Sequence, residues 1–243
     1  MCKSCDDRLM GRRGFLAMAG VGLGLAAGSL AFGAGSAFAA ASGPKTSMTP
    51  DEALAHLKSG NGRYVASPEL CVADLNKRRS DVAMSQAPWA TIVSCSDSRV
   101  PPELLFGGQG LGELFVARNA GNMVDTATMG SIEYGVAVLG APLVLVLGHE
   151  RCGAVVAACD VVSKKATFPG SIGPMVKAIV PAAMAVRKQP GDFVDNAVRE
   201  SARRTAVQIA TRSPVIAPLV KSGKVKVVAA RYDLDDGQVE FFA

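Results

Sequence analysis

Residues 143–153 read LVLVLGHERCG, and this stretch decides the fold. Its first five residues form a continuous apolar run, which is typical of a parallel strand that is buried on both faces of its sheet. His149 and Cys152, two residue types that bind metals, follow directly. In open α/β sheets, functional groups gather outside the carboxyl ends of the strands. The stretch therefore predicts an α/β domain with a functional site where this strand ends.

Strands and helices alternate on both sides of this stretch. The expected strands are Ala90–Cys95, Glu113–Val116 and Leu143–Leu147, and the expected amphipathic helices are Thr128–Leu139 and about Val194 to Ala210. Residues 224–234 and 238–242 flank Asp236-Gly237, which is a strong hairpin signal. This alternation predicts a mostly parallel central sheet that is flanked by helices, with the hairpin appended.

A helical arm is expected ahead of the sheet. Residues 49–52 read TPDE, in which threonine is the N-cap, proline takes the first helical position and glutamate closes a capping box. We expect this helix to run to about Ser59 and to stop at Gly60 and Asn61. His56 lies on it and is expected to face solvent.

The composition excludes several classes of protein. The chain has 243 residues, 49% of them hydrophobic and 19% charged, so it can bury a sizeable core and is not globally disordered. Its net charge of +5 is mild and scattered, which argues against a nucleic-acid partner. The glycines of residues 108–112 precede an expected strand instead of a helix, so they do not form a dinucleotide fingerprint. Two histidines exclude a three-histidine metal site, whereas six cysteines suffice for a thiolate site.

The start of the chain has the features of an export signal. Residues 11–16 (GRRGFL) resemble the twin-arginine motif, an uncharged Gly/Ala-rich stretch follows, and Ala37-Phe38-Ala39 fits a small-x-small cleavage site. We expect a signal peptide at residues 1–39, a linker at 40–48 and one domain at 49–243. Carriage by the twin-arginine translocase predicts a periplasmic protein. The apolar stretch is also long enough to span a membrane, so an uncleaved anchor is the alternative.

Cleavage near Ala39 would remove Cys2 and Cys5 with four basic and two acidic residues, leaving a mature net charge of +3. Of the remaining cysteines, Cys71 and Cys159 have no histidine and no other cysteine close by in the sequence. We expect both to be packing residues, since a free cysteine usually behaves as a small buried hydrophobe.

Two short segments carry the chemistry. CSDSR at residues 95–99 ends one expected strand, and HERCG at residues 149–153 ends another. Because parallel strands end at the same edge of a sheet, Cys95, His149 and Cys152 can converge there. Two thiolates and one imidazole suit Zn²⁺, and three protein ligands leave a fourth position open, as in catalytic zinc sites.

A disulfide between Cys95 and Cys152 is the alternative in an exported protein. Asp97 and Arg99 in the first segment favour the metal site, since a disulfide needs neither of them. The helix that is expected after Cys152 would favour a thiolate there through its N-terminal dipole.

Together the two segments resemble the β-class carbonic anhydrases. The pattern CSDSR, followed about fifty residues later by H-x-x-C-G, is similar to that family, as are residues 60–63, 118–122 and 132–134. The resemblance covers most of the mature chain. It implies the family's α/β fold and the reversible hydration of CO₂ to bicarbonate and a proton, by attack of zinc-bound hydroxide.

The resemblance also implies a role for each residue of the two segments. One zinc per chain is bound by Cys95, His149 and Cys152. Asp97 and Arg99 are the implied catalytic pair: Arg99 holds Asp97 ionised and off the metal, and Asp97 accepts a hydrogen bond from the hydroxide.

The implied substrate side consists of Gln86, Phe115, Tyr134 and Gly153. Gln86 donates a hydrogen bond to an oxygen of CO₂ or bicarbonate, and the two aromatic rings keep the CO₂ side apolar. In the family the active site lies at a dimer interface, so a homodimer or a higher homo-oligomer is expected.

The resemblance also implies a possible pH switch, because in some members of the family the aspartate becomes the fourth zinc ligand at low pH. A tryptophan three residues before the first zinc cysteine helps to form their bicarbonate pocket. Ile92 stands there in this sequence and has no N–H to donate. We therefore expect the open form, with Asp97 paired to Arg99, and Asp97 on zinc is the alternative.

Two other functions fit the same residues. One is a CS₂ or carbonyl sulfide hydrolase with identical ligands and a different pocket. The other is a non-catalytic zinc or thiol protein in which Cys95 and Cys152 act as a redox pair. Metal analysis separates the thiol protein from the enzymes.

Overall fold

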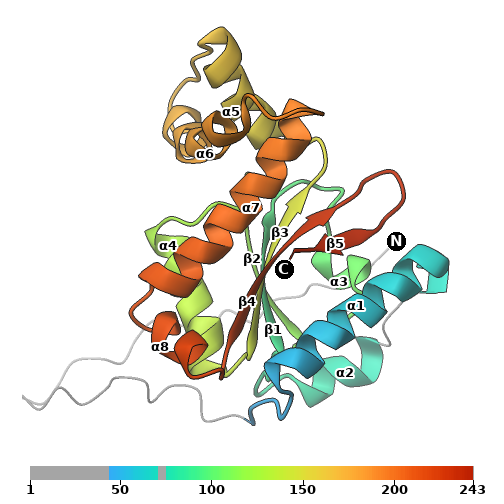
Figure 1. Ribbon diagram of the computed structural model, residues 1–243. Helices are drawn as coiled ribbons and strands as arrows, with labels where there is room; N and C mark the ends of the chain where they lie inside the picture. Colours follow the sequence, from blue (N-terminus) through green and yellow to red (C-terminus); the bar gives the residue numbers. More distant parts are fainter. Residues whose placement is uncertain (1–43, 71–74, 243) are drawn as a thin grey trace, which may run out of the picture. The chain divides into compact units, whose positions relative to one another are not determined.

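The computed structural model describes residues 44–70 and 75–242. Five strands form one sheet in the order β2-β1-β3-β4-β5 (Figure 1). They are β1 (Ala90–Cys95), β2 (Leu114–Asn119), β3 (Leu143–His149), β4 (Lys226–Tyr232) and β5 (Val239–Phe241). Strands β1 to β4 are parallel, and β5 pairs antiparallel with β4. The expected mostly parallel sheet with an appended hairpin is confirmed.

Helices cover both faces of the sheet and one end of it. They are α1 (Pro50–Ala66), the 3₁₀ turn η1 (Pro68–Leu70), α2 (Leu75–Asp81), α3 (Pro102–Leu105), α4 (Thr126–Glu133), the π-helical turn η2 (Tyr134–Val138), α5 (Gly153–Lys164), α6 (Ile172–Val186), α7 (Phe193–Arg212) and α8 (Ile216–Lys221). Figure 1 shows α1 on one face and α7 on the other, with α5 and α6 beyond the carboxyl ends of the strands. Within the described part of the chain, no helix is both long and apolar enough to span a membrane.

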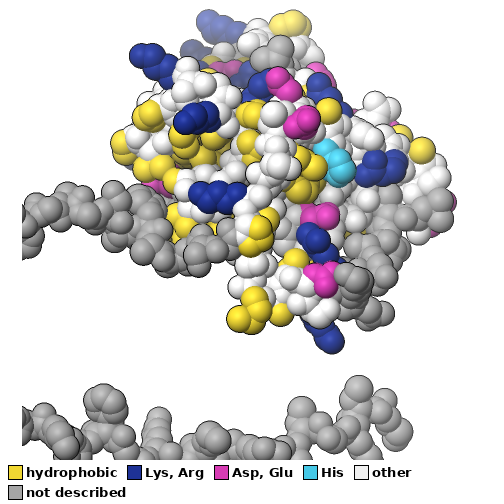
Figure 2. All heavy atoms as spheres, turned by 90° about the horizontal axis from the view of Figure 1, so that it is seen from below, with side chains coloured by type: hydrophobic (Ala, Val, Ile, Leu, Met, Phe, Trp, Pro, Cys, Tyr) yellow, Lys and Arg dark blue, Asp and Glu magenta, His cyan; other side chains and the backbone are white. Residues whose placement is uncertain are grey.

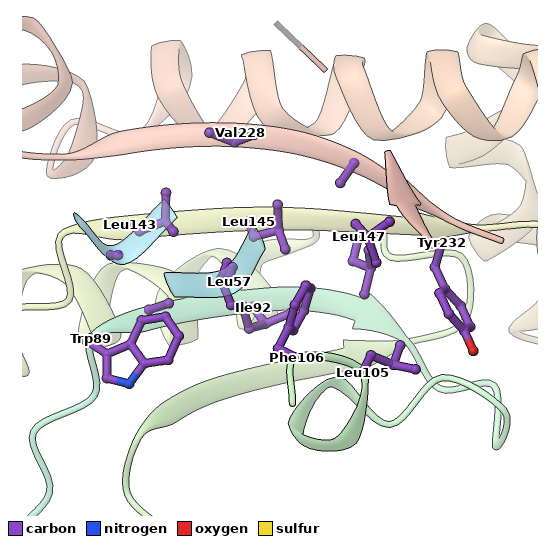
Figure 3. Close-up of a cluster of buried hydrophobic side chains, with 14 of the residues drawn as sticks. Leu57, Trp89, Ile92, Leu105, Phe106, Leu143, Leu145, Leu147, Val228 and Tyr232 are labelled. Atoms are coloured by element: carbon purple, nitrogen blue, oxygen red, sulfur yellow. The ribbon is translucent and has the colours of Figure 1, made fainter. Parts of the chain in front are cut away.

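The core lies between the sheet and its helices. In Figure 3, Ile92 of β1 and Leu145 of β3 face Leu57 of α1 and Phe106, and all four side chains are fully buried. Each such side chain contributes about 1.5–3 kcal/mol relative to exposure. The opposite face of the sheet packs beneath α7, through Ala202 and Ile209 among others. Alternate residues of β1 and β3 thus face two different cores, which explains why both strands are buried along their whole length.

Helix α1 is longer than expected, and the predicted stop at Gly60 and Asn61 is wrong. The capping box at Thr49 forms as predicted, but the helix continues to Ala66. A Cβ on Gly60 would lie 2.0 Å from the carbonyl oxygen of Phe106, so glycine serves a close helix approach here. Asn61 donates hydrogen bonds to the carbonyls of Leu105 (3.1 Å) and Gly237 (2.9 Å). Both residues join the helix to the rest of the fold instead of ending it.

Several other sequence expectations can be compared with the structure. The helix expected over residues 128–139 is α4 followed by η2, and the second expected helix is α7. Helix α6 was not expected, and it contains Pro181.

His56 is half-buried with its ring edge-on to Trp89 (centroids 4.8 Å apart), so it does not simply face solvent. Cys159 packs in the core as expected, whereas Cys71 and the export signal lie outside the described residues.

Figure 2 looks at the end of the domain at which the parallel strands begin. Apolar side chains are exposed there, and Lys and Arg side chains lie scattered among Asp and Glu. The charges on this face therefore do not gather into a patch of one sign.

Candidate metal centre

Two adjacent strands deliver the candidate ligands to one place. Cys95 is the last residue of β1 and His149 is the last residue of β3. The two strands pair in parallel, so their carboxyl ends lie side by side. Cys152 follows three residues later as the N-cap of α5. The short turn from β3 into α5 therefore brings the second sulfur back over the end of β1.

The three side chains form a compact buried cluster. The Sγ atoms of Cys95 and Cys152 are 3.9 Å apart. One ligand atom from each residue lies within 4.8 Å of the others, and the residues are only 5%, 0% and 1% exposed. The structure thus brings together the three residues that the sequence singled out.

His149 is oriented as a metal ligand. Its Nδ1 lies 2.9 Å from the carbonyl oxygen of Glu150. Since a carbonyl only accepts, Nδ1 carries the proton and Nε2 keeps its lone pair. Nε2 is buried and has no hydrogen-bond partner among the described residues. An unpartnered buried nitrogen beside two sulfurs fits a thiophilic metal such as zinc.

The close approach of the two sulfurs shifts the pKa of both thiols. A hydrogen bond from the Cys152 thiol, together with one from the backbone N–H of Gly121 (3.3 Å), lowers the pKa of Cys95 below its usual range. The neighbouring Cys95 sulfur and burial raise the pKa of Cys152 far above its usual range. The backbone N–H groups of Val155 and Ala154 at the start of α5 act in the opposite direction and lower the pKa of Cys152, as expected for a helix N-terminus. Two thiolates require a cation between them.

Asp97 and Arg99 form a tight pair at the mouth of the cluster. Arg99 donates from Nε to Oδ1 (3.0 Å) and from a terminal nitrogen to Oδ2 (2.8 Å) of Asp97. This pairing holds the pKa of Asp97 well below its usual range. Oδ2 also lies 3.8 Å from Nε2 of His149. Asp97 is thus ionised, bound to Arg99 and directed toward the cluster, as the open form requires.

A residue on the next strand fixes the Asp97 loop, and sequence reasoning had assigned it no role. Arg118 of β2 donates from Nε to the carbonyl of Cys95 (3.0 Å) and from a terminal nitrogen to the carbonyl of Asp97 (2.7 Å). The register of β1 on β2 places it there, since Ser94 pairs with Arg118. A basic residue at the carboxyl end of the neighbouring strand was the available signal.

Three of the four expected substrate-side residues lie away from the metal cluster of their own chain. Phe115 pairs with Thr91 and packs on Tyr134 (ring centroids 6.1 Å apart), four positions along the sheet from Cys95. At about 3.3 Å per residue this is a separation of roughly 13 Å. Gln86 is exposed and lies beside Gly112, ahead of β2. Within one chain these three residues do not surround the cluster.

Gly153, the fourth expected substrate-side residue, does lie at the cluster. It is the first residue of α5, directly after Cys152, and a Cβ there would meet no atom within 4 Å. The space above it is open in the single chain.

Comparisons with known proteins point to one family. Residues 90–239 match the sequence model of the family described as carbonic anhydrase. A carbonic anhydrase of Mycolicibacterium smegmatis is 39% identical over 191 residues, which cover 79% of this chain and 92% of that protein. The solved β-carbonic anhydrase of Coccomyxa, in complex with acetazolamide, is 26% identical with a TM-score of 0.58, covering 80% of this chain and 86% of that one.

A tetrameric β-carbonic anhydrase of Sordaria macrospora shares the fold, with a TM-score of 0.61 at 23% identity over 68% of this chain and 85% of that one. The family match includes all three cluster residues together with Asp97, Arg99 and strand β4. β-Carbonic anhydrases use zinc, for which two sulfurs and an imidazole are a suitable donor set. The chain therefore belongs to the β-class carbonic anhydrases, and it catalyses the reversible hydration of CO₂ to bicarbonate and a proton.

Proposed function

We propose that Cys95, His149 and Cys152 hold one catalytic zinc ion per chain. The observation that carries this proposal is Nε2 of His149, which is buried beside two sulfurs and has no hydrogen-bond partner among the described residues. When bound, zinc supplies a Lewis acid that makes water a nucleophile near neutral pH. Three protein ligands leave the fourth position free for that water.

Asp97 is the residue that directs the nucleophile. Its carboxylate is held by Arg99 and lies 3.8 Å from Nε2 of His149, next to the space where the reacting water must lie. Because the pKa of Asp97 is kept low, the carboxylate only accepts hydrogen bonds at neutral pH. It therefore takes a hydrogen bond from the water and points an oxygen lone pair at CO₂. Arg118 holds the loop in place through the carbonyl of Asp97.

The substrate side of the pocket comes from a second copy of the chain. Strand β2 is at the edge of the sheet, so one row of its backbone groups has no strand neighbour among the described residues. Tyr134 is 42% exposed on its Phe115 partner, and Gln86 is exposed nearby. A two-fold pairing across this region would carry these three residues to the partner's zinc site. The tetrameric state of the Sordaria protein supports an assembly built from such dimers.

The protein is proposed to work in the periplasm. The support is the arginine pair at residues 12–13 with the uncharged stretch and the small-x-small site behind it. The twin-arginine translocase carries folded proteins, so zinc can be loaded in the reducing cytoplasm, where the two thiols are protected from oxidation. In cells, Arg12→Lys with Arg13→Lys should leave an unprocessed precursor in the cytoplasm. Processed double mutant in the periplasm would refute the route.

The zinc proposal is tested on purified mature protein. We expect close to one zinc per chain by elemental analysis and rapid CO₂ hydration in a stopped-flow assay. Chelation should remove the metal and the activity together, and added zinc should restore both. A chain that is fully active without stoichiometric metal would disprove the proposal.

A further inference from the structure

Glu150 lies between two of the candidate zinc ligands, and its side chain points to the β4–β5 hairpin. Its Oε2 accepts a hydrogen bond from the backbone N–H of Leu234 at 3.2 Å. Its Oε1 lies 3.7 Å from a terminal nitrogen of Arg231. Its own backbone N–H donates to the carbonyl of Tyr232 at 2.9 Å. Glu150 is thus tied to the hairpin by both its backbone and its side chain.

Those ties fix the carbonyl that orients the imidazole. The carbonyl of Glu150 accepts the hydrogen bond from Nδ1 of His149 at 2.9 Å. The N–H and the carboxylate of Glu150 are anchored on one side of this carbonyl, and Arg151 is held by Asp235 on the other, so the peptide between the two residues has little freedom to rotate. The anchoring of Glu150 therefore decides which ring nitrogen of His149 keeps the proton.

The anchor itself is rigid. Arg231 is 9% exposed and also pairs with Asp195 of α7 and with Asp233 (2.8 Å). Desolvation by burial is more than offset by these carboxylates, so the pKa of Arg231 is raised and the guanidinium stays charged. One buried cation thereby joins helix α7, the hairpin and the loop that carries His149.

Arg151 closes the same loop from the other side. It has a φ of 51°, in the left-handed region that costs a non-glycine residue energy. Its guanidinium pairs with both oxygens of Asp235 (2.6 and 3.0 Å) and approaches Oε2 of Glu150 (3.2 Å). The hairpin therefore holds the tight turn between the two ligands in a conformation that it would not adopt alone.

We propose that Glu150 is a positioning residue for the zinc site, which it serves by holding His149 as the Nδ1–H tautomer with Nε2 directed at the metal. The inference rests on the proposed zinc ligands. Hydrogen-bond partners behind a metal-binding histidine typically change metal affinity by about 10–100-fold when they are lost. Here the partner is a backbone carbonyl, so the side chain acts through the conformation of its own peptide.

The experiment compares Glu150→Ala and Glu150→Gln with the full mature enzyme. Zinc affinity is measured by competition with a chromophoric chelator, and the imidazole nitrogens are followed by ¹⁵N NMR in zinc-free and zinc-loaded protein. The chain has only two histidines, so His56→Gln assigns both sets of signals. The control is Glu240→Ala, which removes a carboxylate from the same hairpin, where it pairs with Arg199 (2.6 Å).

Glu150→Ala should weaken zinc binding roughly 10–100-fold, and its zinc-free His149 should show a mixture of tautomers. Glu150→Gln keeps an oxygen for the Leu234 N–H but loses the charge toward Arg231, so its loss should be smaller. Glu240→Ala should change neither readout, whatever its melting temperature. Unchanged affinity and a single unchanged tautomer in Glu150→Ala would overturn the proposal.

Failure of the zinc site itself would look different. Unsubstituted protein without stoichiometric zinc would disprove the ligand assignment. The tautomer of His149 in the zinc-free chain would still decide the role of Glu150.

Discussion

The two ends of strand β1 differ in how much of a site one chain completes. At the carboxyl end, Cys95 meets His149 and Cys152 in a buried cluster, and hydrogen bonds from Arg99 and Arg118 hold the neighbouring loop. At the amino end, Phe115 and Tyr134 pack on each other beside an open sheet edge, and Tyr134 is 42% exposed. The carboxyl end holds a complete set of metal ligands within one chain. The amino end presents substrate-side residues that are remote from the metal ligands of the same chain.

This difference teaches which part of the chemistry depends on assembly. Buried polar groups must be satisfied locally, so the metal side is built by the fold itself. The substrate side can be completed by a second chain, because its exposed residues are solvated in the single chain and the fold does not depend on contacts to them. We therefore expect zinc binding to survive in single chains and CO₂ turnover to require the assembled pocket.

The largest effect is expected from removing a metal ligand at the carboxyl end of β1. Cys152→Ser removes one thiolate and should lose most of the zinc and all measurable CO₂ hydration. Cys159→Ser is the matched control, since Cys159 is buried on the same helix but lies outside the cluster. Elemental analysis and stopped-flow assays measure both variants. Full zinc occupancy in Cys152→Ser would show that the ligand assignment is wrong.

The next change separates the metal from the residue that aims the nucleophile. Asp97→Asn leaves the three ligands in place and should keep zinc at the unsubstituted level. CO₂ hydration should fall by about 10²-fold or more, because the water loses its anionic acceptor. Asp160→Asn, which disturbs only a surface pair with Lys164 (2.9 Å), serves as the control. Near-normal turnover in Asp97→Asn would show that Asp97 has no role in catalysis.

A third test asks whether the substrate-side residues of one chain contribute to the active site of its partner. Asp97→Asn damages the metal side and Gln86→Ala the substrate side, so each homodimer is weakened at both of its sites. If the sides come from different chains, a mixed dimer has one site with both residues intact. Chains that are co-expressed or refolded together should then recover activity at roughly a quarter of the sites.

The matched control for this mixture is the double variant, which carries both substitutions in one chain. Co-expressed with unsubstituted chain, it gives mixed dimers in which both sites are damaged if the pocket is shared. It should therefore lower activity more than simple dilution does. No recovery in the first mixture, with only simple dilution in the second, would place Gln86 outside the partner's pocket.

The parts of the fold that were readable from sequence are those with local patterns. The buried runs of β1 and β3, the apolar face of α7 and the Asp236-Gly237 turn each specify one element. The convergence of Cys95 with His149 and Cys152 followed from the same patterns, because parallel neighbouring strands end at one edge. Sequence reasoning succeeded wherever the decisive contact lies within an element or between adjacent strands.

The remaining features depend on contacts between segments far apart in the chain. Gly60 reads as a helix stop until Phe106 is placed against it. Glu150 reads as a spacer between two ligands until the hairpin, 84 residues later, binds it. Gln86 reads as a pocket residue, and only the register of the sheet shows that it is remote from the cluster of its own chain. No spacing in the sequence carries this information.

The smallest effect is expected from mild acid. This test asks whether Asp97, at the carboxyl end of β1, stays paired with Arg99 as the pH falls. Ile92 is fully buried in the core, and Asp97 is held by Arg99 rather than by the metal cluster. The pKa of Asp97 is lowered by that pairing, so Asp97 stays ionised as the pH falls from 8 toward 5 and does not release Arg99. Activity should therefore decline smoothly, by about tenfold per pH unit at most, as a single nucleophile takes up one proton. Rate profiles with and without added bicarbonate measure this decline. A steeper loss that involves several protons, or one that bicarbonate sharpens, would mean that Asp97 leaves Arg99 for the metal and that this end of the sheet is a switch.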